Sequence, residues 1–400
     1  MEKIDQPDIN LAKYTSDAPI ILASDYPPSA GGGGAVMLRS LIGPDARPKI
    51  LWASASPAGP VGPTEALLTQ GSAILKSLID RRSMTVDVLL AHRLASELSR
   101  LAAEHHARAF WLVMHGAMVH VAARLLKTTR LPVHLTVHDD PIGVTLMSRR
   151  YLALLPLVQR DFAFAMRRAA SVDVVSDGMA SRYRRAFDIN SIVVHRGMPG
   201  PIAQSVAGHD PRALEIGILG NTYGFHQLPI VARAVEIAAA RSNLRGRIVV
   251  VGQGLGERLR DKVGTRIDVE VTGHLDEPAA IERLARCFCL YLNYPFSPQT
   301  AIFRQTSFPT KLTTYLMAGR PLLAHAGADS SLSSLAVSTG YIARWSSEIV
   351  DEGATEILRL WNLPSAHESQ HAVAEEIRQR YFDLAVNRRR LFRALDALVD

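Results

Sequence analysis

The chain has only two cysteines, Cys287 and Cys289. Their alternation within an apolar run would place both on one face of a strand, where buried, reduced thiols are a better interpretation than a disulfide or metal site. Long apolar runs are also lacking. The longest, residues 110–123, falls short of the ~18 residues of a membrane-spanning helix. The N-terminus carries acidic residues and no apolar segment, so we expect no secretory signal. We therefore expect a cytoplasmic protein, or one peripheral at the inner membrane face.

Lysine is scarce as well, although the chain is basic. Lys and Arg number 45 against 38 Asp and Glu, a net charge of +7, and only seven of the 45 are Lys. Arginine suits bidentate contacts with phosphates and carboxylates, but an Arg-rich chain can equally reflect genome composition. Without basic-aromatic interleaving, nothing supports nucleic-acid binding. Zinc-ligand spacings such as H-x-H and H-E-x-x-H are also lacking, so we expect neither a metal nor a cofactor.

The remaining composition is that of a globular protein, with 48% hydrophobic and 21% charged residues. A length of 400 residues predicts two or three domains. Short apolar runs alternate with longer amphipathic segments, a pattern typical of βα units and parallel sheets. We therefore predict an α/β fold in which two Rossmann-like domains face a central cleft.

A segment rich in Gly and Pro, residues 197–211, predicts the domain boundary. The domains would span residues 1–200 and 201–375, and a C-terminal helix at 376–400 would pack back on the first. The predicted strands are residues 19–26, 49–54, 110–114, 133–137, 171–176, 191–194, 215–219, 247–251, 269–272, 288–293 and 321–325. The predicted helices are residues 35–42, 65–78, 117–127, 229–240, 278–286 and 309–318, with one or two more within 372–400.

A run of four glycines, Gly31, Gly32, Gly33 and Gly34, lies between a predicted strand and helix. Glycines there let the backbone approach a ligand closely, and the helix N-terminus offers N–H groups to an anion. The run lacks the Lys-Ser/Thr ending of a P-loop and the G-x-G-x-x-G spacing of a dinucleotide fold. Two interpretations stay open: a flexible loop, or a loop that closes over a diphosphate or a sugar.

The triplet His138, Asp139 and Asp140 follows the apolar strand VHLTV. Open α/β sheets bind ligands at the carboxyl ends of their strands. A histidine there can donate a hydrogen bond to a sugar hydroxyl or share a proton with an adjacent carboxylate. We predict His138 and Asp139 as catalytic residues, against the alternative of a structural histidine.

The stretch TSFPTKLTTYLMAGRPLLAH, residues 306–325, predicts a helix with Lys311 in its first turn. Thr306 or Ser307 could cap this helix, and Gly319 would end it. Backbone N–H groups and one ammonium would then form a phosphate clamp. The alternative is an ordinary amphipathic helix, which does not compete with a phosphate at the helix end.

Part of this stretch, PTKLTTYLMAGRPLLAH, resembles the "P-S-K-x-x-E-Y-x-A-x-G-x-P-V-x-A" signature of two-domain (GT-B fold) retaining glycosyltransferases, especially family 4. YPPSAGGGGAV is similar to the Gly-rich loop of that family, LPVHLTVHDD to its strand ending in a catalytic-site histidine, and VTGHLDEPAAIERLARCFCLYLNY to its nucleotide-side segment. The resemblance covers most of residues 18–350.

The resemblance implies a role for each matching position. The backbone of Gly31–Gly34 would approach the donor diphosphate or the acceptor, and His138 would contact the donor sugar. Gly220, Asn221 and Thr222 would lie by the diphosphate, His274 and Leu275 by the base, and Thr310 and Lys311 by the distal phosphate. Two family glutamates fall on Thr306 and Thr314, which cannot supply a carboxylate's charge-assisted bond. The family's usual Arg and Lys after the first strand of the second domain are also missing, and Arg304 or Lys311 would take over their neutralisation of the phosphate.

These features lead us to expect a hexosyltransferase-type glycosyltransferase. It would move a sugar from a nucleotide-sugar donor to a glycan, lipid-linked or small-molecule acceptor, with retention and without a metal. Retention rests only on the resemblance. Two alternatives are a nucleotide-sugar epimerase of the same fold and a non-catalytic, glycosyltransferase-like binding subunit.

Residues 143–170 carry five arginines among Leu, Phe and Met. After Pro156, the side chains of Val158, Phe162, Ala165 and Met166 fall on one helical face. Such a helix can rest on an anionic membrane surface, which would give weak, salt-sensitive membrane contact. The alternative is that the apolar face packs against the sheet of the first domain.

Overall fold

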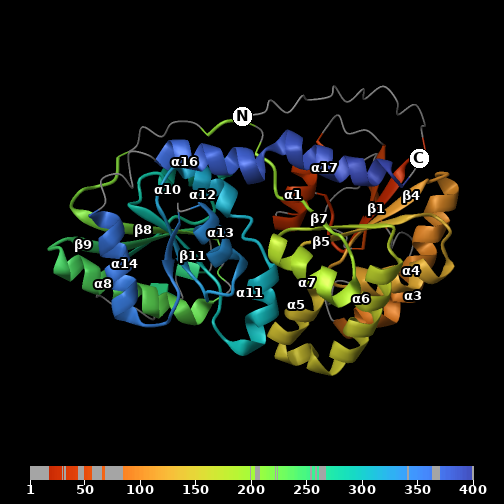
Figure 1. Cartoon of the computed structure of the whole chain (residues 1–400), viewed down its shortest axis with the longest axis horizontal. Helices are drawn as coiled ribbons and strands as arrows, with labels where there is room; N and C mark the ends of the chain where they lie inside the picture. Colours follow the sequence, from red (N-terminus) through yellow and green to blue (C-terminus); the bar gives the residue numbers. More distant parts are fainter. Residues whose placement is uncertain are drawn as a thin grey trace.

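The structure of the chain is a computed structural model. It describes residues 18–28, 30, 33–43, 49–55, 65–67, 84–198, 200–202, 208–220, 222, 224–252, 255–256, 259–260, 267–339, 342–362 and 370–398. Two α/β halves lie side by side, each a parallel sheet between layers of helices (Figure 1). This is the predicted arrangement of two Rossmann-like domains.

The first half contains a seven-stranded parallel sheet in the order β3-β2-β1-β4-β5-β6-β7. Its central strands are fully buried, as expected for parallel strands with both faces covered. The strands are β1 (Ile20–Ser24), β2 (Ile50–Ser54), β3 (Glu65–Leu67), β4 (Ala109–Val113), β5 (Val133–Val137), β6 (Ser171–Val174) and β7 (Ile192–Val193). The helices are α1 (Gly33–Ile42), α3 (Met84–Glu104), α4 (Met118–Thr128), α5 (Pro141–Met147), the 3-10 segment η2 (Arg149–Leu154), α6 (Leu155–Arg168) and α7 (Asp177–Phe187).

The second half contains a six-stranded parallel sheet in the order β10-β9-β8-β11-β12-β13. The strands are β8 (Ala213–Leu219), β9 (Arg245–Val251), β10 (Asp268–Val271), β11 (Cys289–Asn293), β12 (Leu322–His325) and β13 (Ile342–Trp345). The helices are α8 (Leu228–Arg241), α10 (Glu277–Leu284), α11 (Ala301–Thr306), α12 (Leu312–Ala318), α13 (Ser331–Thr339) and α14 (Val350–Trp361), with 3-10 turns η3 (Phe225–Gln227) and η4 (Pro298–Thr300). Cys287 and Cys289 are buried and free.

The C-terminal segment crosses from the second half to the first along the top of Figure 1. It comprises α16 (Gln370–Ile377), the π-helical turn η5 (Arg378–Phe382) and α17 (Leu384–Asp396). The side chains of Leu391 and Leu395 join the core of the first half. The guanidinium of Arg388 donates to the carbonyl oxygens of Ser40 and Leu41, at 2.8 and 3.0 Å, and so holds α17 against the end of α1.

Two local predictions were wrong. Residues 65–67, expected to begin a helix, form β3, which pairs with β2; the rest of that predicted helix lies outside the described residues. Neither Thr306 nor Ser307 caps the helix with Lys311. The chain forms α11, turns after Thr306 and begins α12 only at Leu312, with no side-chain cap. Phe308 and Pro309 lie in this turn, and Pro309 lacks the N–H that a longer helix would use.

The apolar face of α6 does not face solvent. Val158, Phe162, Ala165 and Met166 are buried in the core of the first half. This is the packing alternative weighed for this helix, and it removes the surface that would have entered a membrane. None of the described helices combines the length and apolar composition needed to cross a bilayer.

Candidate functional site

The start of α1 lies against both halves of the molecule. A Cβ built on Gly33 would lie 2.8 Å from Oγ1 of Thr310, in the turn before α12. A Cβ on Gly34 would lie 2.7 Å from the Tyr26 hydroxyl and 2.9 Å from Nδ1 of His138. Only glycine fits at such distances. Gly31 and Gly32 lie outside the described residues.

His138 follows β5, as predicted, and its ring faces Tyr26. The Tyr26 hydroxyl lies 3.4 Å from His138 Nδ1. Burial, and then the nearby carboxylates of Asp25, Asp139 and Asp173, raise the pKa of Tyr26, so its hydroxyl keeps its proton and donates. Burial lowers the pKa of His138, so the imidazole is neutral. Nδ1 then accepts and Nε2 carries the proton. Nε2 is buried and has no hydrogen-bond partner among the described residues.

A histidine and an aspartate form a second pair, at the ends of two neighbouring strands. His115, just after β4, places Nδ1 2.7 Å from Oδ2 of Asp25, just after β1. The rings of His115 and Tyr26 meet edge to face at 6.3 Å. Asp25, Tyr26 and His115 were not predicted as site residues, although they also lie at the carboxyl ends of parallel strands, the position from which His138 was predicted.

Hydrogen bonds join α11 and the residue after it to the first half. The Ser176 hydroxyl, at the N-terminus of α7, donates to the carbonyl oxygen of Thr306 at 2.5 Å. The Ser307 hydroxyl donates to Oδ1 of Asp139 at 3.2 Å. Asp139 therefore contacts the second half, whereas the buried Asp140 caps α5 through the N–H of Gly143.

Lys311 lies at the start of α12 and reaches the end of β8. Its ammonium donates to the carbonyl oxygen of Leu219 at 2.8 Å. Burial lowers the pKa of Lys311 to about 8. With a pKa of about 8, Lys311 is still mostly protonated at neutral pH, and an anion that enters its surroundings stabilises the ammonium. This suits the predicted phosphate contact.

The other predicted residues of this stretch have protein partners. Thr306 is fully buried, and its hydroxyl donates to the carbonyl oxygen of Ile302. Arg304 forms a bidentate ion pair with Asp329, at 2.7 and 2.8 Å. The Thr314 hydroxyl lies 3.1 Å from Oε1 of Glu277, which also accepts from Arg196 at 2.7 Å. A carboxylate from α10 thus lies beside Thr314, the position at which the sequence resemblance implies a glutamate.

The remaining predicted residues lie at strand ends of the second half. Gly220 follows β8 with a positive φ of 60°, and open space surrounds the position of a Cβ. The Thr222 hydroxyl donates to Oδ1 of Asn293. His274 is exposed and Leu275 half-buried, both just before α10. Asn221 lies outside the described residues.

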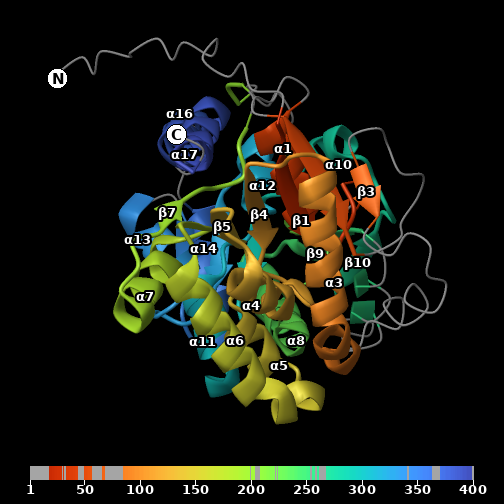
Figure 2. The same ribbon diagram turned by 90° about the vertical axis from the view of Figure 1, so that its right-hand side faces the viewer.

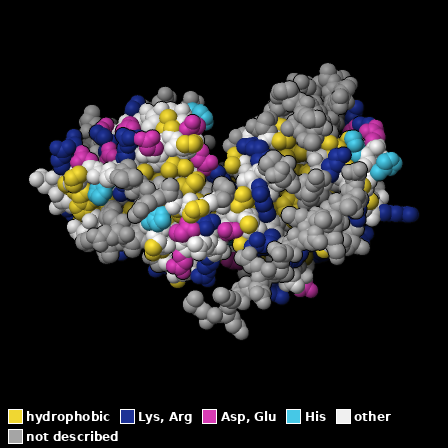
Figure 3. Space-filling model, turned by 90° about the horizontal axis from the view of Figure 1, so that it is seen from above, with side chains coloured by type: hydrophobic (Ala, Val, Ile, Leu, Met, Phe, Trp, Pro, Cys, Tyr) yellow, Lys and Arg dark blue, Asp and Glu magenta, His cyan; other side chains and the backbone are white. Residues whose placement is uncertain are grey.

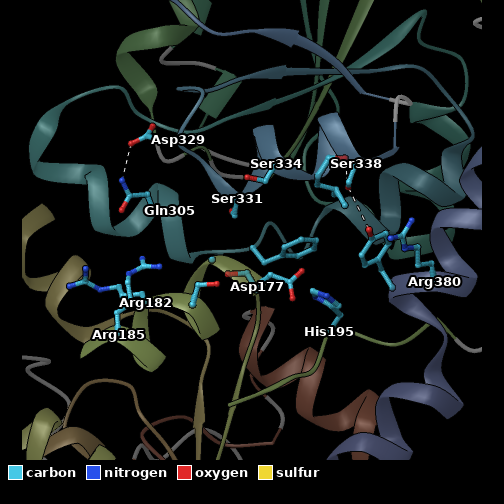
Figure 4. Close-up of a pocket in the computed structure, with 16 residues that line it drawn as sticks. Asp177, Arg182, Arg185, His195, Gln305, Asp329, Ser331, Ser334, Ser338 and Arg380 are labelled. Carbon is cyan, nitrogen blue, oxygen red and sulfur yellow. Dashed lines mark hydrogen bonds between the residues drawn. The ribbon is translucent and has the colours of Figure 1, made fainter. Parts of the chain in front are cut away.

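A cavity of about 670 Å³ opens between the two halves on another side. Its walls come from α7, from α13 and from the C-terminal segment (Figure 4). In Figure 2, α7 and α13 lie on the opposite side of the molecule from β3 and β10. None of the predicted site residues in the described ranges lines this cavity. From above, the surface is hollowed between the two halves (Figure 3).

No family model and no curated protein matches the sequence. Solved structures do. A sucrose-phosphate synthase from Thermosynechococcus elongatus is 15% identical, with a TM-score of 0.68 over 95% of this chain and 99% of that one. Anabaena HepE, in complex with UDP and glucose, is 15% identical, with a TM-score of 0.62 over 94% and 99%. A UDP-forming trehalose-phosphate synthase from Burkholderia xenovorans, in complex with glucose-6-phosphate, is 12% identical, with a TM-score of 0.60 over 95% and 100%.

At these identities the likeness establishes the fold. The chain has the two-domain GT-B architecture of these proteins over nearly its whole length. Activity, substrates and residue roles are separate questions, because one fold can carry many functions.

Proposed function

We propose that this protein is a glycosyltransferase that moves a sugar from a nucleotide-sugar donor to an acceptor, with retention and without a metal. One observation carries the proposal: the start of α1 meets His138 through Gly34 and the Thr310–Lys311 turn through Gly33. His138, proposed to contact the sugar, and Thr310, proposed to contact the distal phosphate, thus lie against neighbouring residues of α1. The fold of proteins solved with UDP, glucose or glucose-6-phosphate supports the same assignment.

The residues suit the charge changes of such a transfer. The bond from the sugar carbon to the diphosphate breaks, a bond to an acceptor oxygen forms, and the diphosphate leaves with the bonding electrons. Lys311 and the N–H groups at the start of α1 would stabilise that negative charge. The Nε2–H of His138 would donate to an oxygen of the donor sugar and hold the reacting carbon in place. The acceptor would be a glycan, a lipid-linked sugar or a small molecule.

The first experiment is a thermal-shift screen with UDP, GDP, ADP and their sugars, because a bound ligand raises the melting temperature by mass action. Transfer is then assayed with the stabilising donor and a panel of acceptors. His138→Ala should lower kcat by about 100-fold or more, the usual effect of losing one positioned donor. Nucleotide affinity should stay near the wild-type value.

The outcomes separate the alternatives. Conversion of the donor sugar without any acceptor would identify an epimerase. Nucleotide binding without turnover on a broad panel would identify a binding subunit. No stabilisation by any nucleotide or nucleotide sugar would overturn the proposal.

A further inference from the structure

The cavity between α7 and α13 is not lined by His138 or Lys311, the residues proposed for the transfer site. Hydrogen bonds from Ser176 to Thr306 and from Ser307 to Asp139 tie α11 and the following turn to the first half. Gly178 packs so closely that a Cβ would lie 2.1 Å from the Gln305 carbonyl oxygen. This contact lies along one wall of the cavity, which at about 670 Å³ has the size of a small-molecule site.

The cavity carries an excess of positive charge from two elements. Arg182 and Arg185 come from α7 and Arg380 from η5, and Figure 4 shows them at opposite ends of the cavity. Arg185 and Arg380 form no ion pair with any described residue, whereas Arg182 lies 3.5 Å from Asp140. Of the two lining carboxylates, Asp177 and Asp329, the second is already paired with Arg304. An anion would therefore be attracted to this cavity.

The wall between these arginines offers hydrogen-bond acceptors. The hydroxyls of Ser176, Ser334 and Ser338 donate to backbone carbonyls. The Ser176 oxygen also accepts from the Met179 N–H, and the Ser338 oxygen lies 3.5 Å from the Tyr381 hydroxyl, so each keeps one lone pair to accept, whereas Ser334 keeps both. His195, only 4% exposed, lines the same cavity. Its Nδ1 is buried and has no hydrogen-bond partner among the described residues. Burial lowers the pKa of His195 to about 4, so its ring is neutral and one of its two nitrogens is an acceptor.

Arginine donors and hydroxyl acceptors together select a ligand that carries both an anion and O–H groups. We propose that this cavity is a second binding site, distinct from the cleft of the proposed transfer, for a phosphorylated polyol of the sugar-phosphate class. The phosphate would contact Arg185 at the α7 end of the cavity, and Arg380 at the opposite end would add to the positive charge that attracts it. A ligand hydroxyl would donate to the imidazole of His195. Such a ligand would touch both halves and the C-terminal segment at once. This site does not depend on the proposed transferase activity.

The test is titration calorimetry with glucose 6-phosphate, in the presence of saturating UDP to occupy the other cleft. Two comparison ligands are glucose, which has the sugar hydroxyls but no phosphate, and inorganic phosphate, which is the anion without the sugar. The wild-type protein should bind glucose 6-phosphate at least tenfold more tightly than either. The Arg185→Gln/Arg380→Gln variant should lose at least tenfold in that affinity. The matched control is Arg344→Gln/Arg389→Gln, which removes the same charge from exposed positions outside the cavity and should bind like wild type.

The His195→Phe variant tests the hydrogen-bond acceptor of His195 separately from the positive charge of the arginines. The phenyl ring keeps the packing on Phe308 and Phe382, whose ring centroids lie 4.6 and 5.5 Å from the imidazole. This variant should weaken glucose 6-phosphate binding several-fold and leave inorganic phosphate binding unchanged. Three results would overturn the proposal: no binding of glucose 6-phosphate to the wild type, equal affinities in the arginine and control variants, or binding that UDP abolishes. A wild type that fails to bind UDP but binds glucose 6-phosphate overturns only the transferase assignment.

Discussion

Gly34 and His138 lie so close that no side chain fits between them. A Cβ on Gly34 would lie 2.9 Å from His138 Nδ1 and 2.7 Å from the Tyr26 hydroxyl. The glycine run of the sequence thus serves a specific contact at this position: it lets the first turn of α1 approach the ends of β1 and β5. The flexible-loop interpretation does not explain this contact.

Gly34→Ala should therefore damage the site. The methyl group must displace His138 or Tyr26, so we expect a loss of stability of about 1–3 kcal/mol, as for overpacking, and a lower kcat. Urea unfolding and the transfer assay measure the two effects. Gly200→Ala is the control, because nothing lies within 4 Å of a Cβ there. Equal stability of the two variants would contradict this account of Gly34.

Both sheets could be predicted from the sequence. Parallel strands that are covered on both faces are apolar along their whole length, and the central strands appear in the sequence as such apolar runs. It also placed His138 at a strand end, where the structure has it. β3 was mistaken for a helix because only three residues of it, Glu65–Leu67, pair with β2. A strand so short has no period that distinguishes it from a helix.

The contacts of the site could not be predicted from local patterns. The partner of His115 is Asp25, and the partner of Thr314 is Glu277; both pairs form only when strands and helices far apart in the chain come together. The helix start near Lys311 was misplaced because Thr306 and Ser307 are good capping residues in isolation. In the structure their hydroxyls instead bond the Ile302 carbonyl and Asp139.

Lys311→Met should weaken nucleoside-diphosphate binding by about 1–3 kcal/mol, the range for a charge-assisted contact. The pKa of about 8 adds a pH signature. As pH rises through 8 the free wild-type protein loses this cation, so its affinity for the nucleotide should fall, whereas the affinity of the variant should not follow that curve. Titration calorimetry from pH 6.5 to 9 measures both. Unchanged affinity in the variant would remove Lys311 from the phosphate site.

Stability gives an independent check on Lys311. The folded-state pKa is lowered to about 8, below the ordinary value of about 10.4 for lysine, so the unfolded chain binds more protons between these two pH values. Stability that depends on Lys311 therefore rises with pH across this window. The free energy of unfolding of the wild type, minus that of Lys311→Met, should increase from pH 8 to pH 10. A flat difference would mean that the ammonium is not buried.

We expect the Glu277 carboxylate to bind the ribose of the nucleotide, because it lies beside Thr314, where the sequence resemblance implies a ribose-binding glutamate. Its carboxylate lies 3.1 Å from the Thr314 hydroxyl, where it can accept from a ribose hydroxyl in a charge-assisted bond. The wild type should then bind a nucleoside diphosphate more tightly than its 2′-deoxy analogue, and Glu277→Gln should reduce that preference. Glu282→Gln, on the exposed side of the same helix, is the control. The same preference in both variants would exclude Glu277 from the ribose site.

Asp161→Asn should destabilise the first half without touching the site. The carboxylate is 3% exposed and accepts from His120, Arg124 and Arg160, at 2.8, 3.2 and 2.8 Å. Burial alone would raise the pKa of Asp161, but the hydrogen bonds from His120 and Arg160 outweigh it and the pKa is lowered. Loss of such bonds should cost about 3 kcal/mol at pH 7, since each bond to a charged group contributes about 1.5–3 kcal/mol.

The Asp161 carboxylate also determines how the loss of stability in Asp161→Asn depends on pH. Because the folded-state pKa of Asp161 is lowered, the ionised carboxylate stabilises the fold at pH values above its unfolded pKa of about 3.9. This stabilisation is lost as pH falls through the folded-state pKa. The difference in unfolding free energy between wild type and Asp161→Asn should be constant from pH 7 to about 5 and shrink below about 4. Urea unfolding at pH 7, 5 and 3 measures it, with Asp351→Asn, at an exposed ion pair, as the control. A difference that does not shrink at low pH would show that the asparagine perturbs packing rather than charge.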